Sequence, residues 1–135
     1  MALRNNLNQK DYFEIDIIGD GNCFYRYLSM YFEKTQENYK YYRQIIFNYI
    51  SNNKTLFIQF FAQKENENNK EYERRFSIYI NNILSEGSYA GDFEISSASS
   101  VLNRNIIIYR PTTNNEYEYY NNYQENTLNL INSHN

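Results

Sequence analysis

The chain has 135 residues, which suits one compact domain and leaves little room for two. A net charge of −3 and a pI of about 5.2 give no reason to expect nucleic-acid binding, because a phosphate backbone requires a basic face. The single cysteine excludes an internal disulfide, and no signal peptide or apolar run long enough to cross a bilayer is visible. We therefore expect a cytoplasmic, monomeric protein without a membrane partner, although export without a cleaved signal would leave no trace.

The first third of the chain leads into a helix. Residues 1–11 are polar, and we interpret them as a flexible arm before a single domain that spans residues 12–135. Alternating apolar and acidic residues over 13–18 indicate a short extended segment, and Gly19-Asp-Gly-Asn then predicts a tight turn. From Cys23 the apolar residues recur at helical spacing and form one stripe: Phe24, Tyr27, Leu28, Tyr31 and Phe32.

The middle of the chain predicts more helices. The first covers residues 39–50, a short one covers 56–61, and a longer one covers 72–84, with a polar surface turn at 64–70. The apolar face of the helix at 39–50 comprises Tyr42, Ile45, Ile46 and Tyr49. That of the helix at 72–84 comprises Phe76, Ile80, Ile83 and Leu84.

The last third predicts one helix and then strands. Gly87-Ser-Tyr-Ala-Gly interrupts the pattern, Asp92 stands where a helix N-cap belongs, and residues 93–102 follow as a helix. The β-branched run Asn105-Ile-Ile-Ile-Tyr predicts a buried strand, and 117–120 and 127–131 predict two more. Helices first and strands after indicate an α+β fold in which helices cover one sheet.

One stretch, Asp20-Gly-Asn-Cys-Phe-Tyr-Arg-Tyr-Leu-Ser, places a thiol at the start of a predicted helix. The first N–H groups of a helix lack intrahelical partners, and their partial positive charge favours a thiolate and an oxyanion formed beside it. Gly19 and Gly21 permit positive φ and a close approach of substrate to the backbone. From local physics alone the alternative stays open that Cys23 is a small buried hydrophobe, as most free thiols are.

This stretch resembles the signature of the ovarian-tumour (OTU) family of cysteine proteases, in which an Asp-Gly-Asn-Cys turn leads into a helix with a following aromatic residue or leucine, an arginine and Leu-Ser. A second block, from Gly87 to Tyr109, resembles the family's later region, where a glycine-flanked aromatic residue precedes a Glu-Ile helix and the core strand. The two blocks stand in the family's order and cover about a quarter of the chain. The resemblance implies the OTU-type, papain-like cysteine protease fold, with a small central sheet flanked by helices.

The resemblance also implies roles for individual residues. Cys23 matches the nucleophile, and Asp20 matches the aspartate whose surroundings, with Gly21 and Asn22, help to form the oxyanion hole through the N–H groups of Cys23 and its neighbours. Arg26 matches the family arginine, for which a structural anchor is expected. The resemblance places the substrate channel at Tyr89, Gly91 and Glu94. Tyr89 stands where the family usually has tryptophan, and we expect Glu94 to organise loops or support the channel.

A thiol protease also needs a base, and the chain has one histidine, His134. The family places its histidine near the end of the domain, followed by an aromatic residue and then Asn or Asp, whereas His134 is followed directly by Asn135. Two interpretations stay open. In the first, His134 is the base, oriented by Asn135 or another residue; in the second, the family segment lies beyond residue 135 and the domain is truncated here.

The resemblance therefore implies a deubiquitinase that hydrolyses isopeptide bonds of ubiquitin or a ubiquitin-like modifier through an acyl-enzyme on Cys23. We expect no cofactor and no metal, since no cysteine and histidine cluster exists. A catalytically inactive OTU-fold module that binds ubiquitin or acts as a scaffold is the alternative, and an interaction domain with a core cysteine is the third hypothesis.

Overall fold

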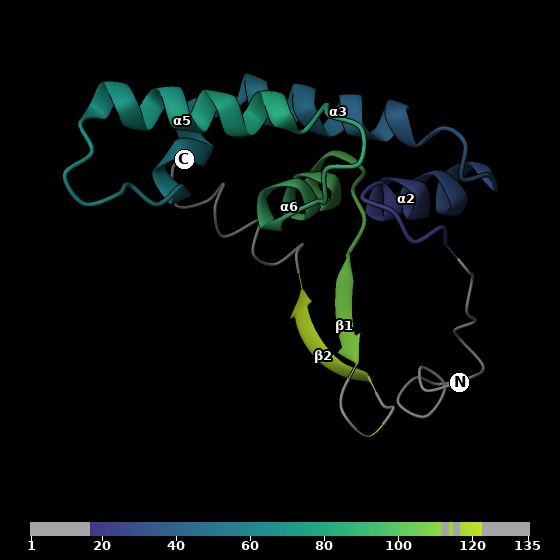
Figure 1. Ribbon diagram of the computed structural model, residues 1–135. Coiled ribbons are helices and arrows are strands. Elements are labelled where there is room, and N and C mark those ends of the chain that lie inside the picture. The colour runs from purple at the N-terminus through teal and green to yellow at the C-terminus, as the bar shows by residue number, and fades with distance from the viewer. Residues whose placement is uncertain (1–16, 112–113, 115–116, 123–135) are drawn as a thin grey trace.

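The computed structural model describes residues 17–111, 114 and 117–122, in which helices are followed by a β-hairpin. Two long helices, α3 (Tyr39–Asn52) and α5 (Asn69–Asn82), form one layer, beneath which lie α2 (Cys23–Glu33) and α6 (Asp92–Val101) (Figure 1). The remaining elements are α4 (Lys54–Phe57), the 3₁₀ turn η1 (Ile58–Phe60), β1 (Ile107–Pro111) and β2 (Tyr117–Asn122). None of the described helices has the length and apolar character needed to span a membrane.

The two strands form an antiparallel hairpin on the side of α2 and α6 that faces away from α3 (Figure 1). Ile107 lies opposite Asn122 and Pro111 opposite Tyr117, with a bulge after Ile108. The strands predicted at 105–109 and 117–120 are therefore confirmed as strands, but the first is not buried as predicted, since Ile107 is 39% exposed. The described sheet has two strands, so the small central sheet flanked by helices stays a prediction. The strand expected at 127–131 and the arm at 1–11 lie outside the described residues, as does most of the segment at 13–18.

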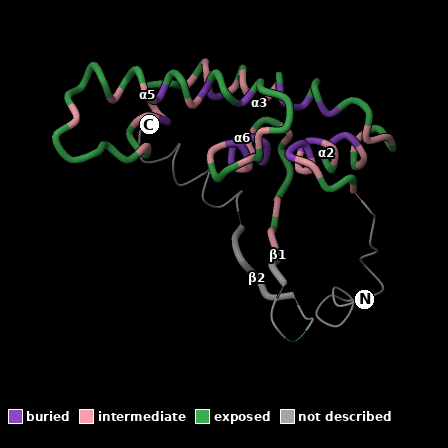
Figure 2. Tube along the Cα trace, viewed as in Figure 1, coloured by how far each residue is buried: buried purple, intermediate pink, exposed green. Residues whose placement is uncertain are grey.

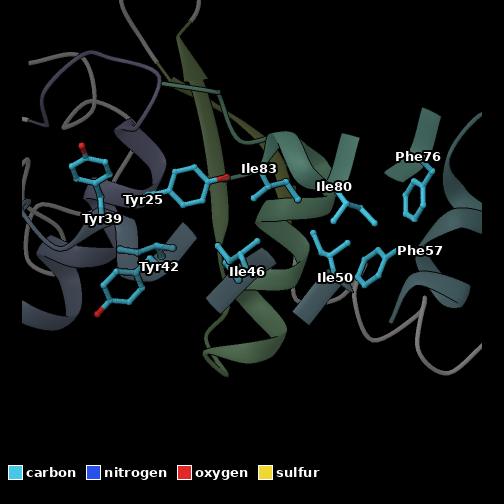
Figure 3. Packing of buried hydrophobic residues seen from close by; sticks show 11 residues of the cluster. Tyr25, Tyr39, Tyr42, Ile46, Ile50, Phe57, Phe76, Ile80 and Ile83 are labelled. Carbon is cyan, nitrogen blue, oxygen red and sulfur yellow. The ribbon is translucent and has the colours of Figure 1, made fainter. Parts of the chain in front are cut away.

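The core is one row of buried side chains between the layers. Figure 3 shows this row, and Figure 2 shows that the buried positions of α2, α3 and α6 lie on their inner faces. α3 packs against both α2 and α6, so its apolar face occupies the centre of the molecule. The buried apolar residues are Tyr25, Leu28, Tyr39, Tyr42, Ile46, Ile50, Phe57, Phe76, Ile80, Ile83 and Ala98.

The inner face of α2 differs from the predicted stripe. Leu28 is buried as expected, but Tyr27 and Tyr31 are 47% and 51% exposed, whereas Tyr25 is fully buried. The ring of Tyr25 lies under the guanidinium of Arg43 on α3, 4.0 Å from the ring centroid. A cation over a ring face is attracted by its quadrupole, so the arginine favours rotation of α2 toward Tyr25.

Capping residues shift two predicted helix starts. α5 begins at Asn69, three residues before the predicted start, because the Asn68 side chain accepts the N–H of Glu71 at 2.8 Å. α6 has Gly91 rather than Asp92 as its N-cap, and the Glu94 carboxylate accepts the Gly91 N–H at 3.1 Å. The predicted N-cap at Asp92 is thus wrong by one residue, because Glu94 reaches back to close the cap.

Candidate active site

The single thiol lies at the first position of α2. Cys23 is free and half-buried, and it is not part of the buried core cluster. Its N–H donates to the carbonyl of Asp20 at 3.1 Å and closes the preceding turn. Within the described residues no acceptor takes the N–H groups of Phe24 and Tyr25, as is usual in the first turn of a helix. Cys23 can serve as the predicted oxyanion donor only if the Asp20 carbonyl releases its N–H.

Asp20 uses both carboxylate oxygens to organise this turn. Arg26, one turn into α2, donates to them from Nε at 3.2 and 3.3 Å and from Nη2 at 3.2 Å. The backbone N–H of Asn22 donates to Asp20 Oδ1 at 3.0 Å. The hydrogen bonds from Arg26, with a smaller contribution from Asn22, lower the pKa of Asp20. Arg26 thus anchors a loop, as the resemblance implies, and Asp20 is the group that it anchors.

Gly21 brings two distant backbones into contact. A Cβ added at Gly21 would overlap the carbonyl group of Gly87 and lie 2.8 Å from Gly87 Cα. The predicted positive φ is wrong for Gly19 and Gly21, since among the described glycines only Gly87 has one, at 81°. The backbone of Gly87 approaches Gly21 closely, whereas the approach of a substrate there stays a prediction.

Asn22 connects the same two segments through its side chain. It is buried, and its Oδ1 accepts the N–H of Gly87 at 2.9 Å. Its Nδ2 donates to Asp20 Oδ2 at 3.2 Å and to Glu86 Oε1 at 3.4 Å. The residue before the thiol is therefore held by the Glu86–Gly87 turn, 64 and 65 residues further along the chain.

Arg43, which the sequence interpretation missed, reaches the contact between these two segments from the second turn of α3. It is only 2% exposed and donates to Asn22 Oδ1 at 2.7 Å and to the Gly21 carbonyl at 3.1 Å. On the other side it donates to the Ser88 carbonyl at 2.7 Å, to Ser88 Oγ at 3.0 Å and to the Ile83 carbonyl at 2.8 Å. The available signal was a charged residue between Tyr42 and Ile46 on an otherwise apolar helical face.

The predicted channel residues occupy two different environments. Tyr89 is 73% exposed on the segment between α5 and α6. Glu94 is buried in α6, where its oxygens accept the Tyr79 hydroxyl at 2.7 and 2.9 Å and the Gly91 N–H. Burial raises the pKa of Glu94, and these hydrogen bonds oppose the effect. Glu94 therefore organises the glycine segment, while a channel lined by these residues stays a prediction.

The remaining predicted site residue is the candidate base, His134. His134 and Asn135 lie outside the described residues, so both interpretations of the histidine stay predictions. Within the described part of the chain, no three His, Cys, Asp or Glu side chains gather as metal ligands.

Comparison with known proteins agrees with this architecture. The family model described as OTU-like cysteine protease matches residues 18–134. The OVARIAN TUMOR DOMAIN-containing deubiquitinating enzyme 7 of Arabidopsis thaliana is 31% identical over 96 residues, which is 71% of this chain. Those residues are 23% of that protein, so the chain spans less than a quarter of its length.

Two solved structures are similar in fold. The OTU domain of OTUD1 has a TM-score of 0.68 at 21% identity, covering 86% of this chain and 71% of that one. The viral OTU domain protease from Farallon virus has a TM-score of 0.62 at 23% identity, covering 84% and 72%. At these identities the likeness shows the fold alone, which is the papain-like OTU fold. With a family model matched over nearly all of its length and the thiol at the start of α2, this chain belongs to the family of OTU-like cysteine proteases.

Proposed function

We propose that the chain is a thiol-dependent deubiquitinase that hydrolyses isopeptide bonds of ubiquitin or ubiquitin-like conjugates. One observation carries the proposal: a free, half-buried thiol begins a helix and follows a turn held by hydrogen bonds on both sides. Membership in a family described as cysteine proteases and the name of the Arabidopsis relative support this reaction and this substrate class.

The proposed reaction has two steps. The base takes the proton of the Cys23 thiol, the sulfur attacks the carbonyl carbon of the modifier's C-terminal glycine, and the C–N bond breaks as the base passes that proton to the leaving lysine amine. Water then attacks the thioester, the base takes a proton from it, and the C–S bond breaks to release the modifier's carboxylate while that proton returns to the Cys23 sulfur. The N–H groups at the start of α2 stabilise the oxyanion in both steps, and Asp20 holds the turn without touching the reacting atoms.

The first experiment tests the nucleophile. Purified protein is incubated with ubiquitin that carries a C-terminal electrophile, and the adduct is mapped by mass spectrometry. We expect one adduct, at Cys23, and none with Cys23→Ala. Ser85→Ala, an exposed change on the turn after α5, serves as the folded control and should label as the wild type does. Absence of an adduct in the folded wild type would refute the proposed nucleophile.

The second experiment tests turnover and the base. Cleavage of di-ubiquitin is compared for the wild type, His134→Gln and Asn135→Ala. If His134 is the base, His134→Gln should lower the rate by about 10²- to 10⁴-fold, while Asn135→Ala lowers it less. Equal rates for His134→Gln and the wild type would place the base elsewhere. Labelling at Cys23 without any turnover of the wild type would favour the ubiquitin-binding module instead.

A further inference from the structure

The guanidinium of Arg43 is buried and has no carboxylate partner among the described residues. Each of its hydrogen bonds to described residues goes to a neutral oxygen, and its remaining polar contact is the ring of Tyr25. Its Nε is buried and has no hydrogen-bond partner in the described part of the chain. Burying a cation in this way is unfavourable, and an apolar side chain of similar volume fills such a place at lower cost. Its neighbours on this face, Ile46 and Ile50, are apolar.

The acceptors of Arg43 belong to two segments that the fold must hold together. Gly21 and Asn22 immediately precede the thiol, whereas Ile83 and Ser88 flank the turn after α5. The planar guanidinium donates to both at once because its N–H groups point in fixed directions. Arg43 therefore determines the separation of these segments and the position of the backbone that leads into Cys23.

We propose that Arg43 is a positioning residue for catalysis. Through Gly21 and Asn22 it orients the nucleophile turn, residues 20–22 before Cys23, without touching the substrate. The proposal rests on the proposed function, since it assigns Arg43 a part in that reaction. It differs from a purely stabilising role, because its loss should misplace Cys23 and the first N–H groups of α2 in a chain that remains folded.

Arg75 supplies the matched control. Like Arg43 it stacks on an aromatic ring, with its guanidinium 4.4 Å from the centroid of Phe61, and it donates to a backbone carbonyl, that of Ala62. It also pairs with Glu67, and none of its contacts with described residues involves the turn before Cys23. Arg43→Met and Arg75→Met therefore both remove a guanidinium that stacks on an aromatic ring. Arg43→Met does so beside the turn that precedes the thiol, and Arg75→Met does so away from it.

The first readout is the release of a fluorogenic group from the C-terminus of ubiquitin. Arg43→Met should lower kcat on the order of 10- to 100-fold, with KM changed by no more than about twofold, because misplacing reacting groups by about 1 Å has effects of this size. Arg75→Met should change neither constant once its folded fraction is taken into account. Equal kcat values for the two folded variants would overturn the proposal.

The second readout does not depend on activity. The Gly87 N–H donates to the same Asn22 oxygen that Arg43 holds, so its hydrogen exchange, measured by NMR, reports on the junction. Arg43→Met should accelerate this exchange by about tenfold or more, whereas Arg75→Met should leave it unchanged. If the wild type turns over no ubiquitin substrate, the proposed function has failed. The positioning of the turn by Arg43 is then tested by exchange alone, and an unchanged Gly87 exchange rate in Arg43→Met would refute it.

Two milder variants cover the case in which Arg43→Met does not fold. Arg43→Lys keeps the charge but not the planar fork, and Ser88→Ala removes one acceptor while leaving the backbone carbonyls. Both should lower kcat and accelerate Gly87 exchange in the same direction, by about threefold or more. Wild-type values of kcat and exchange in both variants would overturn the proposal.

Discussion

Replacing Gly21 with alanine tests whether the nucleophile turn is packed against the turn after α5. The new Cβ would lie 2.8 Å from Gly87 Cα and closer still to its carbonyl, whereas an ordinary contact of this kind is about 3.4 Å or longer. The atoms that the new Cβ would meet are backbone atoms of Gly87, so no flexible side chain can move aside. The segments must separate, and the 2.9 Å hydrogen bond between Gly87 N–H and Asn22 Oδ1 is lost.

The size of the effect follows from these two changes. Overpacking a well-filled site costs about 1–3 kcal/mol, and the loss of one hydrogen bond costs about 0.5–1.5 kcal/mol more, since Asn22 Oδ1 keeps Arg43 as a donor. Gly21→Ala should therefore lower the free energy of unfolding by roughly 1.5–4.5 kcal/mol. Urea unfolding followed by far-UV circular dichroism measures this loss as a fall in the midpoint of about 0.5 M or more.

Gly19→Ala is the control, two residues away in the same turn. Nothing lies within 4 Å of a Cβ at Gly19, and its φ is not positive. Alanine there should leave the stability unchanged or raise it by up to about 1 kcal/mol, because it restricts the unfolded chain. Equal midpoints for the two variants would refute the close packing of Gly21 on Gly87.

Three further predictions, each checked by urea unfolding, concern the charges and the core. The hydrogen bonds from Arg26 lower the pKa of Asp20, so the wild type should have a higher free energy of unfolding than Asp20→Asn. This difference should be complete above about pH 4 and disappear as the pH falls through the pKa of Asp20 in the folded state. A constant difference from about pH 6 to pH 2 would contradict this. Burial raises the pKa of Glu94, so the wild type loses stability as the pH rises through the pKa of Glu94 in the folded state. Glu94→Gln does not titrate there, so its free energy of unfolding should rise relative to that of the wild type between about pH 4 and pH 8. Ile46→Ala should cost about 2–5 kcal/mol because Ile46 is fully buried, whereas Ile78→Ala on the outer face of α5 should stay within about 0.5 kcal/mol.

Much of the helical framework could be predicted because apolar spacing reports burial directly. The helix expected at 39–50 corresponds to α3, and its predicted face contains the buried Tyr42 and Ile46. The prediction for α2 was weaker because tyrosine satisfies an apolar pattern whether or not it is buried. Spacing alone could not distinguish Tyr25, which packs under a guanidinium, from Tyr27, which is half exposed.

The candidate site was predictable where it is local and unpredictable where it is not. The turn from Asp20 to Asn22 and the helix start at Cys23 follow from the glycines and the helical apolar spacing within a few residues. The partners of that turn could not be found this way. Arg43 and Gly87 are distant in the sequence, and periodicity carries no information about which distant backbone a buried arginine or asparagine contacts.

The two sequence blocks that carry the family resemblance are therefore two sides of one contact. Gly21 lacks a side chain because the Gly87 carbonyl occupies that space, and Gly87 adopts a φ of 81° that other residues rarely adopt. Asn22 then needs both an acceptor for the Gly87 N–H and a donor for Asp20, and an amide supplies both. An aspartate at position 22 would lack the donor and would place a second carboxylate beside Asp20. The residues before the thiol are thus determined by packing between distant segments as much as by chemistry at the sulfur, so a substitution at Gly87 should impair the same turn as one at Gly21.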